Sequence, residues 1–137
     1  MEYVDTNVII YHLIGDSIYG ENARSYLEKV AEGERHAVSS VYLFAEVYAT
    51  LRMFKKTQEE IYRHLDDLSK IGIEFLDLNF YILRSALEEF KAGLKFGDAI
   101  HLKTMEEYDV NDIVSEDKDF DPIEGINRIS LKKALKM

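Results

Sequence analysis

The sequence contains no cysteine, which excludes disulfide bonds, thiolate-bound zinc and a cysteine nucleophile. One proline and seven glycines in 137 residues are too few for a low-complexity or loop-built protein. No apolar run approaches the roughly 18 residues that a membrane-spanning helix requires. The N-terminus has no basic region, and Asp5 interrupts the apolar stretch that a signal peptide would need. These absences predict a cytoplasmic protein that does not engage a membrane.

Acidic side chains outnumber basic ones, 26 to 17, which gives a formal net charge of −9. A net negative charge normally argues against nucleic-acid binding. The imbalance is uneven, because residues 125–137 carry four basic side chains and no acidic one. The rest of the chain is therefore more acidic than the total suggests. Such an excess either serves solubility or includes a group of carboxylates that holds a cation.

Apolar residues alternate between the spacing of strands and that of helices along the chain. Short strands are predicted over residues 3–4, 36–38, 73–78, 112–115 and 127–129. Helices are predicted near residues 23–31, 41–56, 57–71, 79–93 and 98–105. Thr57 and Asn79 are the expected N-caps of two of them, and Asp98 is expected to open the last. This alternation indicates one α/β domain over residues 1–137, with a central parallel sheet covered on both faces.

Four acids occupy places where such a fold would expose them. Asp5 and Asp117 follow predicted strands, and the carboxyl ends of parallel strands share one edge of the sheet. Asp98 lies in the first turn of a predicted helix, where the helix dipole favours a carboxylate. Glu46 lies on a helix between apolar neighbours. Taken alone, each acid is explained without a functional role, as a helix cap, a turn residue or a solvated charge.

The segments around these acids resemble the acidic motifs of the PIN domain family. They are VDTN at 4–7, SSVYLFAEV at 39–47, GDAIHL at 97–102 and VSEDKDF at 114–120. They follow the family's order and usual separations, so the resemblance spans nearly the whole chain. It is closest to the small VapC-type toxin ribonucleases of toxin–antitoxin pairs. The resemblance implies a three-layer α/β/α fold.

The same resemblance implies a function and a set of site residues. It implies a divalent-metal-dependent endoribonuclease whose catalytic and metal-binding acids are Asp5, Glu46, Asp98 and Asp117. The residues expected to support them are Thr6, Asn7, Ser115 and Asp119. The implied partners are an RNA substrate, an antitoxin protein and a second copy of the chain in a homodimer. The alternative is a catalytically inactive PIN-like scaffold that binds RNA or protein, and the presence of all four acids argues against it.

Electrostatics independently favours a cation among converging acids. Two carboxylates about 4 Å apart repel by about 4 kcal/mol at an effective dielectric constant near 20. Three or four such groups cannot all stay ionised and unpaired, so they take up protons or a cation. Ligands that are all oxygen suit Mg²⁺ or Mn²⁺ rather than zinc. A metal held in this way can activate water for attack on a phosphodiester.

Other residues give weaker signals. His101 lies three residues after Asp98, where a general base is conceivable but a structural or surface role is favoured. Lys91 and Lys95 flank the approach to Asp98 and are candidates for phosphate contacts. An aspartyl phosphatase would have a second aspartate where this chain has Asn7. A receiver domain would have acids before its phosphorylated aspartate and a late lysine after a strand, and neither is evident.

Overall fold

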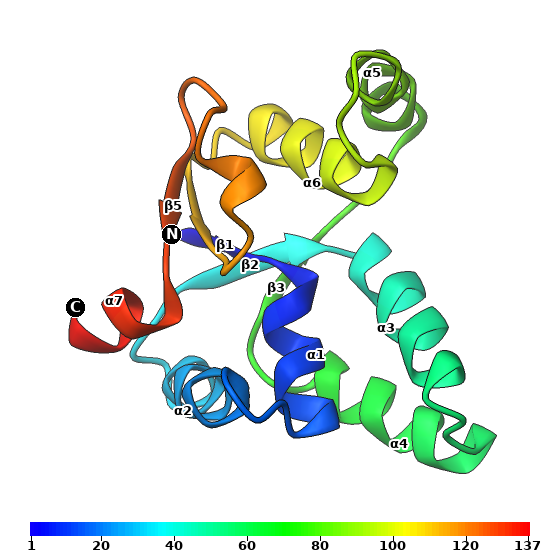
Figure 1. Ribbon diagram of the computed structural model, residues 1–137, viewed down its shortest axis with the longest axis vertical. Helices are drawn as coiled ribbons and strands as arrows, with labels where there is room; N and C mark the ends of the chain where they lie inside the picture. Colours follow the sequence, from blue (N-terminus) through cyan, green and yellow to red (C-terminus); the bar gives the residue numbers. More distant parts are fainter.

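The computed structural model describes all 137 residues and arranges five parallel strands in one sheet between two layers of helices (Figure 1). The strands are β1 (Glu2–Val4), β2 (Ala37–Ser40), β3 (Glu74–Leu76), β4 (Asp112–Val114) and β5 (Asn127–Ile129). Their order across the sheet is β3-β2-β1-β4-β5, and every neighbouring pair is parallel. The three-layer α/β/α fold expected from the sequence is confirmed.

Seven α-helices and one short 3₁₀-helix connect the strands. They are α1 (Thr6–Ile14), α2 (Gly20–Ala31), α3 (Tyr42–Met53), α4 (Gln58–Ser69), α5 (Phe80–Lys91), α6 (Phe96–Glu107), η1 (Lys118–Phe120) and α7 (Leu131–Lys136). Helices α1, α2, α3, α4 and α7 lie on one side of the sheet, and α6, η1 and the more distant α5 lie on the other (Figure 1). No helix has the length and apolar character needed to cross a bilayer.

The central strands divide the hydrophobic core in two. Val4 and Val114 pack with the helices of the α1 layer, whereas Tyr3 and Ile113 pack with α6 and η1. All four side chains are fully buried. Successive residues of a strand point to opposite faces, so the stretch of a strand that is covered on both faces is apolar. This explains why two consecutive apolar residues follow the acidic first residue of β1 and of β4.

Two of the helix starts follow the capping signals expected from the sequence. Thr57 and Glu60 form a reciprocal capping box at the start of α4, and the side chain of Asn79 accepts a hydrogen bond from the backbone of α5. The helix expected to open at Asp98 instead begins at Phe96. The ring of Phe96 packs edge-to-face against Tyr42 and Phe90, which anchors the extra residues. Asp98 therefore lies within the first turn of α6.

The strand order reverses beside β1, which sets the position of the site. Strands β1 to β3 extend the sheet in one direction, and β4 and β5 extend it in the other. Ligands of open parallel sheets bind beyond the carboxyl ends of the strands at such a reversal. Asp5 directly follows β1, and Ser115 directly follows β4. The topology thus brings these two residues together although 110 positions separate them.

Candidate acidic metal site

Three carboxylates converge beyond the end of β4. Asp98, Asp117 and Asp119 each place an oxygen within 4.8 Å of the other two. Asp117 is the N-cap of η1, and its side chain accepts a hydrogen bond of 2.9 Å from the backbone N–H of Asp119. This turn brings Asp117 and Asp119, which we call the loop acids, next to Asp98 on α6. Sequence reasoning gave Asp119 only a supporting part, whereas the geometry places it beside the two principal acids.

Asp5 is tied to this cluster by one hydroxyl group. The Ser115 Oγ donates a hydrogen bond of 2.6 Å to Asp5 Oδ2 and accepts one of 2.9 Å from the backbone N–H of Asp117. Asp5 is only 4% exposed, and this burial raises the pKa of its carboxyl group, with the Ser115 hydrogen bond in partial opposition. The half-buried side chain of Asn7 takes part in none of these hydrogen bonds. Ser115 is therefore the link between β1 and the acidic loop.

The carboxyl group of Asp98 is also strongly perturbed. Burial, together with the negative charges of Asp5 and Asp117, raises the pKa of Asp98 to about 6. Its Oδ2 is buried and has no hydrogen-bond partner, the only such side-chain atom in the protein. Buried polar atoms without a partner are rare in native proteins and call for a missing ligand or a functional reason. A cation among the acids would satisfy this oxygen.

Glu46 lies beside Asp5 and outside the three-carboxylate cluster. Its Oε1 accepts a hydrogen bond of 2.7 Å from Thr6 Oγ1 and lies 2.5 Å from His101 Nε2. Its charge contributes to the raised pKa of Asp5. The structure thus gathers all four sequence-predicted acids in one region, but only Asp98 shares the 4.8 Å cluster with the loop acids. Metal binding by each of the four acids stays a prediction.

His101 is a buried part of this region. It is 1% exposed, and its Nδ1 lies 2.6 Å from the hydroxyl oxygen of Tyr3. Sequence reasoning favoured a structural or surface role, and the surface role is wrong. Its contact with Glu46 was missed because the two residues are 55 positions apart and no local pattern joins them.

A lysine lies at the open side of the cluster. Lys95 Nζ is 3.9 Å from Asp119 Oδ2, and the Lys95 side chain is 78% exposed. It precedes α6 directly, so it lies next to the turn that carries Asp98. This exposed cation therefore lies beside the acidic cluster without being buried in it.

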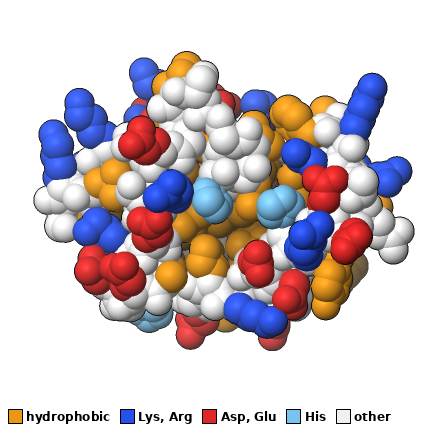
Figure 2. Space-filling view, turned by 90° about the horizontal axis from the view of Figure 1, so that it is seen from below, with side chains coloured by type: hydrophobic (Ala, Val, Ile, Leu, Met, Phe, Trp, Pro, Cys, Tyr) orange, Lys and Arg blue, Asp and Glu red, His pale blue; other side chains and the backbone are white.

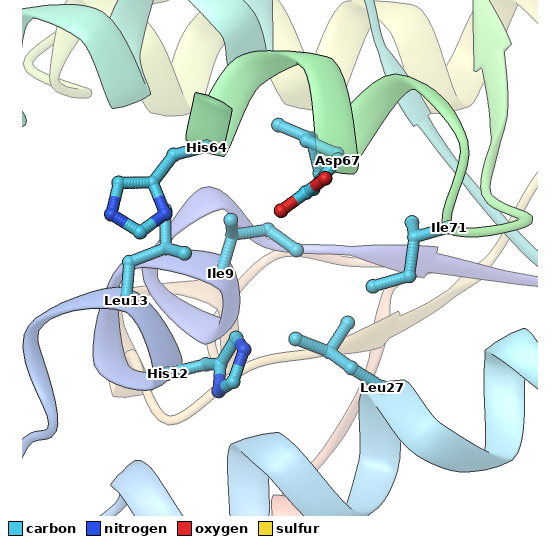
Figure 3. A pocket seen from close by; sticks show the side chains of 8 residues that line it. Ile9, His12, Leu13, Leu27, His64, Asp67 and Ile71 are labelled. Carbon is cyan, nitrogen blue, oxygen red and sulfur yellow. The ribbon is translucent and has the colours of Figure 1, made fainter. Parts of the chain in front are cut away.

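A separate apolar groove of about 340 Å³ lies between α1, α2 and α4 (Figures 2 and 3). It is lined by Ile9, His12, Leu13, Leu27, His64, Asp67, Leu68 and Ile71. In Figure 3, His12 comes from α1, and His64 and Asp67 come from α4. None of the acids in the four motifs lines this groove. The groove and the carboxylate cluster are therefore distinct features of the surface.

The sequence matches the family model described as PIN domain over residues 3–126. The chain belongs to the PIN domain family. PIN domains are nucleases, so membership indicates a nuclease. No curated protein sequence matches this PIN domain.

Solved structures share the fold at low sequence identity. The Mycobacterium tuberculosis toxin VapC20, described as cleaving the sarcin–ricin loop, has a TM-score of 0.72 at 12% identity, over 89% of this chain and 94% of VapC20. VapBC2 from Rickettsia felis, bound to a DNA fragment from its promoter, has a TM-score of 0.66 at 18% identity, over 95% and 98% of the two chains. A Klebsiella pneumoniae toxin–antitoxin complex has a TM-score of 0.66 at 18% identity, over 96% and 98%. These likenesses show the fold.

Proposed function

We propose that this PIN domain is a divalent-metal-dependent endoribonuclease that hydrolyses RNA phosphodiesters and acts as the toxin of a toxin–antitoxin pair. The observation that carries the proposal is the convergence of Asp98, Asp117 and Asp119 around a buried carboxylate oxygen without a partner. Membership of a nuclease family and the fold shared with toxin–antitoxin structures support it. An inactive scaffold would have no use for this costly arrangement of like charges.

The donor atoms fit Mg²⁺ or Mn²⁺. They are carboxylate oxygens alone, which hard divalent cations prefer, and the orphaned Oδ2 of Asp98 lacks the positive partner that a cation supplies. Asp98, Asp117 and Asp119 would hold the ion, with Asp5 and Glu46 beside them. When bound, Mg²⁺ or Mn²⁺ supplies an activated water and offsets negative charge on the leaving oxygen.

The chain's own residues prepare the site in three ways. Asp98 must be ionised to bind the cation, and because its pKa is raised to about 6, it stays largely protonated in weakly acidic solution. Ser115 keeps Asp5 and the backbone of Asp117 in fixed relation through its two hydrogen bonds. Lys95 offers an exposed charge to a phosphate of the substrate strand.

Cleavage of labelled single-stranded RNA by the purified protein tests the proposal, with DNA of the same sequence as the comparison. Cleavage is expected with Mg²⁺ or Mn²⁺ and should be absent in EDTA. Asp98→Asn should abolish it while leaving the circular dichroism spectrum unchanged. Asp67→Asn is the matched control, because Asp67 lines the separate groove. RNA cleavage that persists in EDTA, or that Asp98→Asn leaves intact, contradicts the proposal.

The proposed partners follow from the same site. The acidic cluster would attract basic side chains of an antitoxin, which could then block the approach of RNA. Neutralising those antitoxin side chains should relieve inhibition of the nuclease, and full inhibition after neutralisation would contradict this mechanism. A small DNA-binding protein encoded beside the gene is the expected antitoxin. A homodimer is also proposed, and light scattering of the purified protein tests it.

A further inference from the structure

The carboxylate of Glu46 lies in a socket built from separate parts of the chain, which we call the Glu46 socket. Its walls are Thr6 at the start of α1, Gly97 at the start of α6, and His101 one turn further along α6. Tyr3 of β1 is hydrogen-bonded to the ring nitrogen of His101 that faces away from Glu46. Thr6 and His101 contact the carboxylate group itself, and the absent side chain of Gly97 leaves room for it.

One oxygen of Glu46 receives both hydrogen bonds. Thr6 Oγ1 donates to Oε1, and His101 Nε2 lies 2.5 Å from the same atom, so Nε2 carries a hydrogen. The opposite ring nitrogen, Nδ1, lies 2.6 Å from the hydroxyl oxygen of Tyr3, within hydrogen-bond distance. Tyr3 is fully buried, and burial raises the pKa of its hydroxyl, which therefore keeps its proton. This chain of donors holds Oε1 and leaves Oε2 for another ligand.

The second oxygen occupies the space of a missing side chain. A Cβ at Gly97 would lie 2.5 Å from Glu46 Oε2, well inside van der Waals contact. At the other glycines, the atoms nearest to such a Cβ are backbone atoms, or no atom lies within 4 Å. The backbone of Gly97 is not in the left-handed region, so space rather than conformation requires glycine here. Gly97 precedes Asp98, and Oε2 therefore lies against the turn that carries the cluster acid.

We propose that Gly97 and the Tyr3–His101 pair are positioning residues that hold Oε1 of Glu46 and direct Oε2 toward the cation-binding acids. The proposal rests on the metal site of the proposed function. Hydrogen bonds from behind a metal-binding carboxylate set its orientation and so influence metal affinity. The socket is the only set of contacts in which Glu46 takes part as a hydrogen-bond acceptor.

Gly97→Ala is the most direct test because stability and metal binding should respond differently. The added Cβ displaces only the end of a flexible side chain, and alanine favours a helix more than glycine does. The melting temperature in EDTA should therefore hold or rise, while Mn²⁺ affinity measured by calorimetry falls roughly tenfold. Gly93→Ala is the matched control: its φ of 117° strains alanine, but nothing lies within 4 Å of a Cβ there. It should lose stability and bind Mn²⁺ normally.

Tyr3→Phe tests the other wall of the socket. It removes one buried hydroxyl and should weaken Mn²⁺ binding several-fold by freeing the ring of His101. Tyr26→Phe removes a similar buried hydroxyl that is bonded to Glu2 instead, and it should leave Mn²⁺ affinity unchanged. In a Glu46→Gln background, Tyr3→Phe should cause no further loss, because it acts through Glu46. His101→Gln, which keeps an amide donor, should bind Mn²⁺ more tightly than His101→Leu.

The outcomes separate this inference from the proposed function. If the wild-type protein binds no Mn²⁺, the metal site and the socket inference both fail. If the wild type binds Mn²⁺ and both Gly97→Ala and Tyr3→Phe bind it equally well, the metal site stands and the positioning role is overturned. A Tyr3→Phe loss that persists unchanged in the Glu46→Gln background also overturns it, because the effect would then bypass Glu46.

Discussion

A buried acid lies at each end of β1, and the two acids differ in the charge of their side-chain partners. Glu2 lies at the first residue of the strand, where Arg35 Nη2 contacts its Oε1 at 2.5 Å and Arg35 Nε its Oε2 at 3.0 Å. Tyr26 donates a further hydrogen bond to Glu2. Asp5 follows the last residue, and its side-chain partner is the neutral hydroxyl of Ser115.

Glu2 is paired with an arginine and stabilises the fold, whereas Asp5 and Asp98 have no lysine or arginine bonded to them. Arg35 also donates a hydrogen bond of 3.3 Å to the carbonyl of Ala134, so the Glu2 end joins β1 to α7. At the other end, burial raises the pKa of Asp5, the negative charge of Asp5 helps to raise the pKa of Asp98, and no buried lysine or arginine lies there. Sites that violate the usual rule of paired buried charges are commonly functional. Mutations at the Glu2 end of β1 should therefore lower stability and leave metal binding intact, whereas mutations at the Asp5 end should impair metal binding.

The largest effect is expected from Arg35→Met, which leaves Glu2 buried without its cation. The side chains of Arg35 and Glu2 are only 11% and 10% exposed, and breaking such a pair typically costs about 3–5 kcal/mol. Urea denaturation measures the loss. Arg24→Met, which breaks an exposed pair with Glu28, should cost less than about 0.5 kcal/mol. Equal losses in the two variants would mean that the Glu2 end is not specially stabilised.

A slightly smaller effect is expected from Mn²⁺ itself. At a free concentration of 100 times its Kd, a ligand that binds only the folded protein stabilises it by about 2.7 kcal/mol. The melting temperature of the wild type should rise accordingly, and that of Asp98→Asn should not. Arg35→Met should keep the full Mn²⁺-dependent gain despite its lower starting stability, because it alters only the opposite end of β1. Loss of that gain would show that the two ends are coupled.

Without metal, Asp98→Asn should stabilise the protein at neutral pH. The folded pKa of Asp98, about 6, lies above its ordinary value of 3.8, so ionisation favours the unfolded chain. The penalty is absent below pH 4, grows between pH 4 and 6, and stays constant above. After allowance for partial solvent screening, the gain at pH 7 should be about 1–2 kcal/mol. Asp5→Asn should act in the same direction, since burial also raises the pKa of Asp5.

Chemical denaturation in EDTA at pH 4 and pH 7 checks this effect. The stability difference between Asp98→Asn and the wild type should appear at pH 7 and vanish at pH 4. A wild type that is more stable than Asp98→Asn at both pH values would mean that Asp98 is an ordinary capping acid. Asp67→Asn, in the separate groove, controls for the general effect of removing one negative charge.

The sequence predicted the sheet and most helices because their signals are local. The strand at Asn127–Ile129 and the capped helices after Thr57 and Asn79 follow from neighbouring residues alone. Strand β3 spans Glu74–Leu76 and is shorter than the expected run of residues 73–78. Helix α7 was not predicted, since six residues rich in lysine give too short a pattern of periodicity.

The site was predictable as a set of motifs but not as a set of contacts. The motifs predicted four acids, each in a short characteristic segment, and the fold brings these acids into one region. The sequence could not assign His101 to Glu46 or Arg35 to Glu2, because these partners are 55 and 33 positions apart. It also could not show that Gly97 makes room for a carboxylate. Such contacts depend on the register of packed elements, which no local pattern encodes.

The smallest expected effect concerns the exposed counterpart of the Glu2–Arg35 pair, at the site end of the sheet. Lys95 and Asp119 are 3.9 Å apart with side chains 78% and 58% exposed, so water screens their attraction. Lys95→Met should therefore change stability by less than about 0.5 kcal/mol. If Lys95 contacts a substrate phosphate, the KM for RNA should rise several-fold with kcat unchanged, and its dependence on salt should weaken. Lys29→Met, which breaks another exposed pair, controls for lost charge. The buried Glu2–Arg35 pair would then affect only stability, and the exposed Lys95–Asp119 pair only substrate binding. Equal KM values for Lys95→Met and Lys29→Met would mean that Lys95 does not contact the substrate.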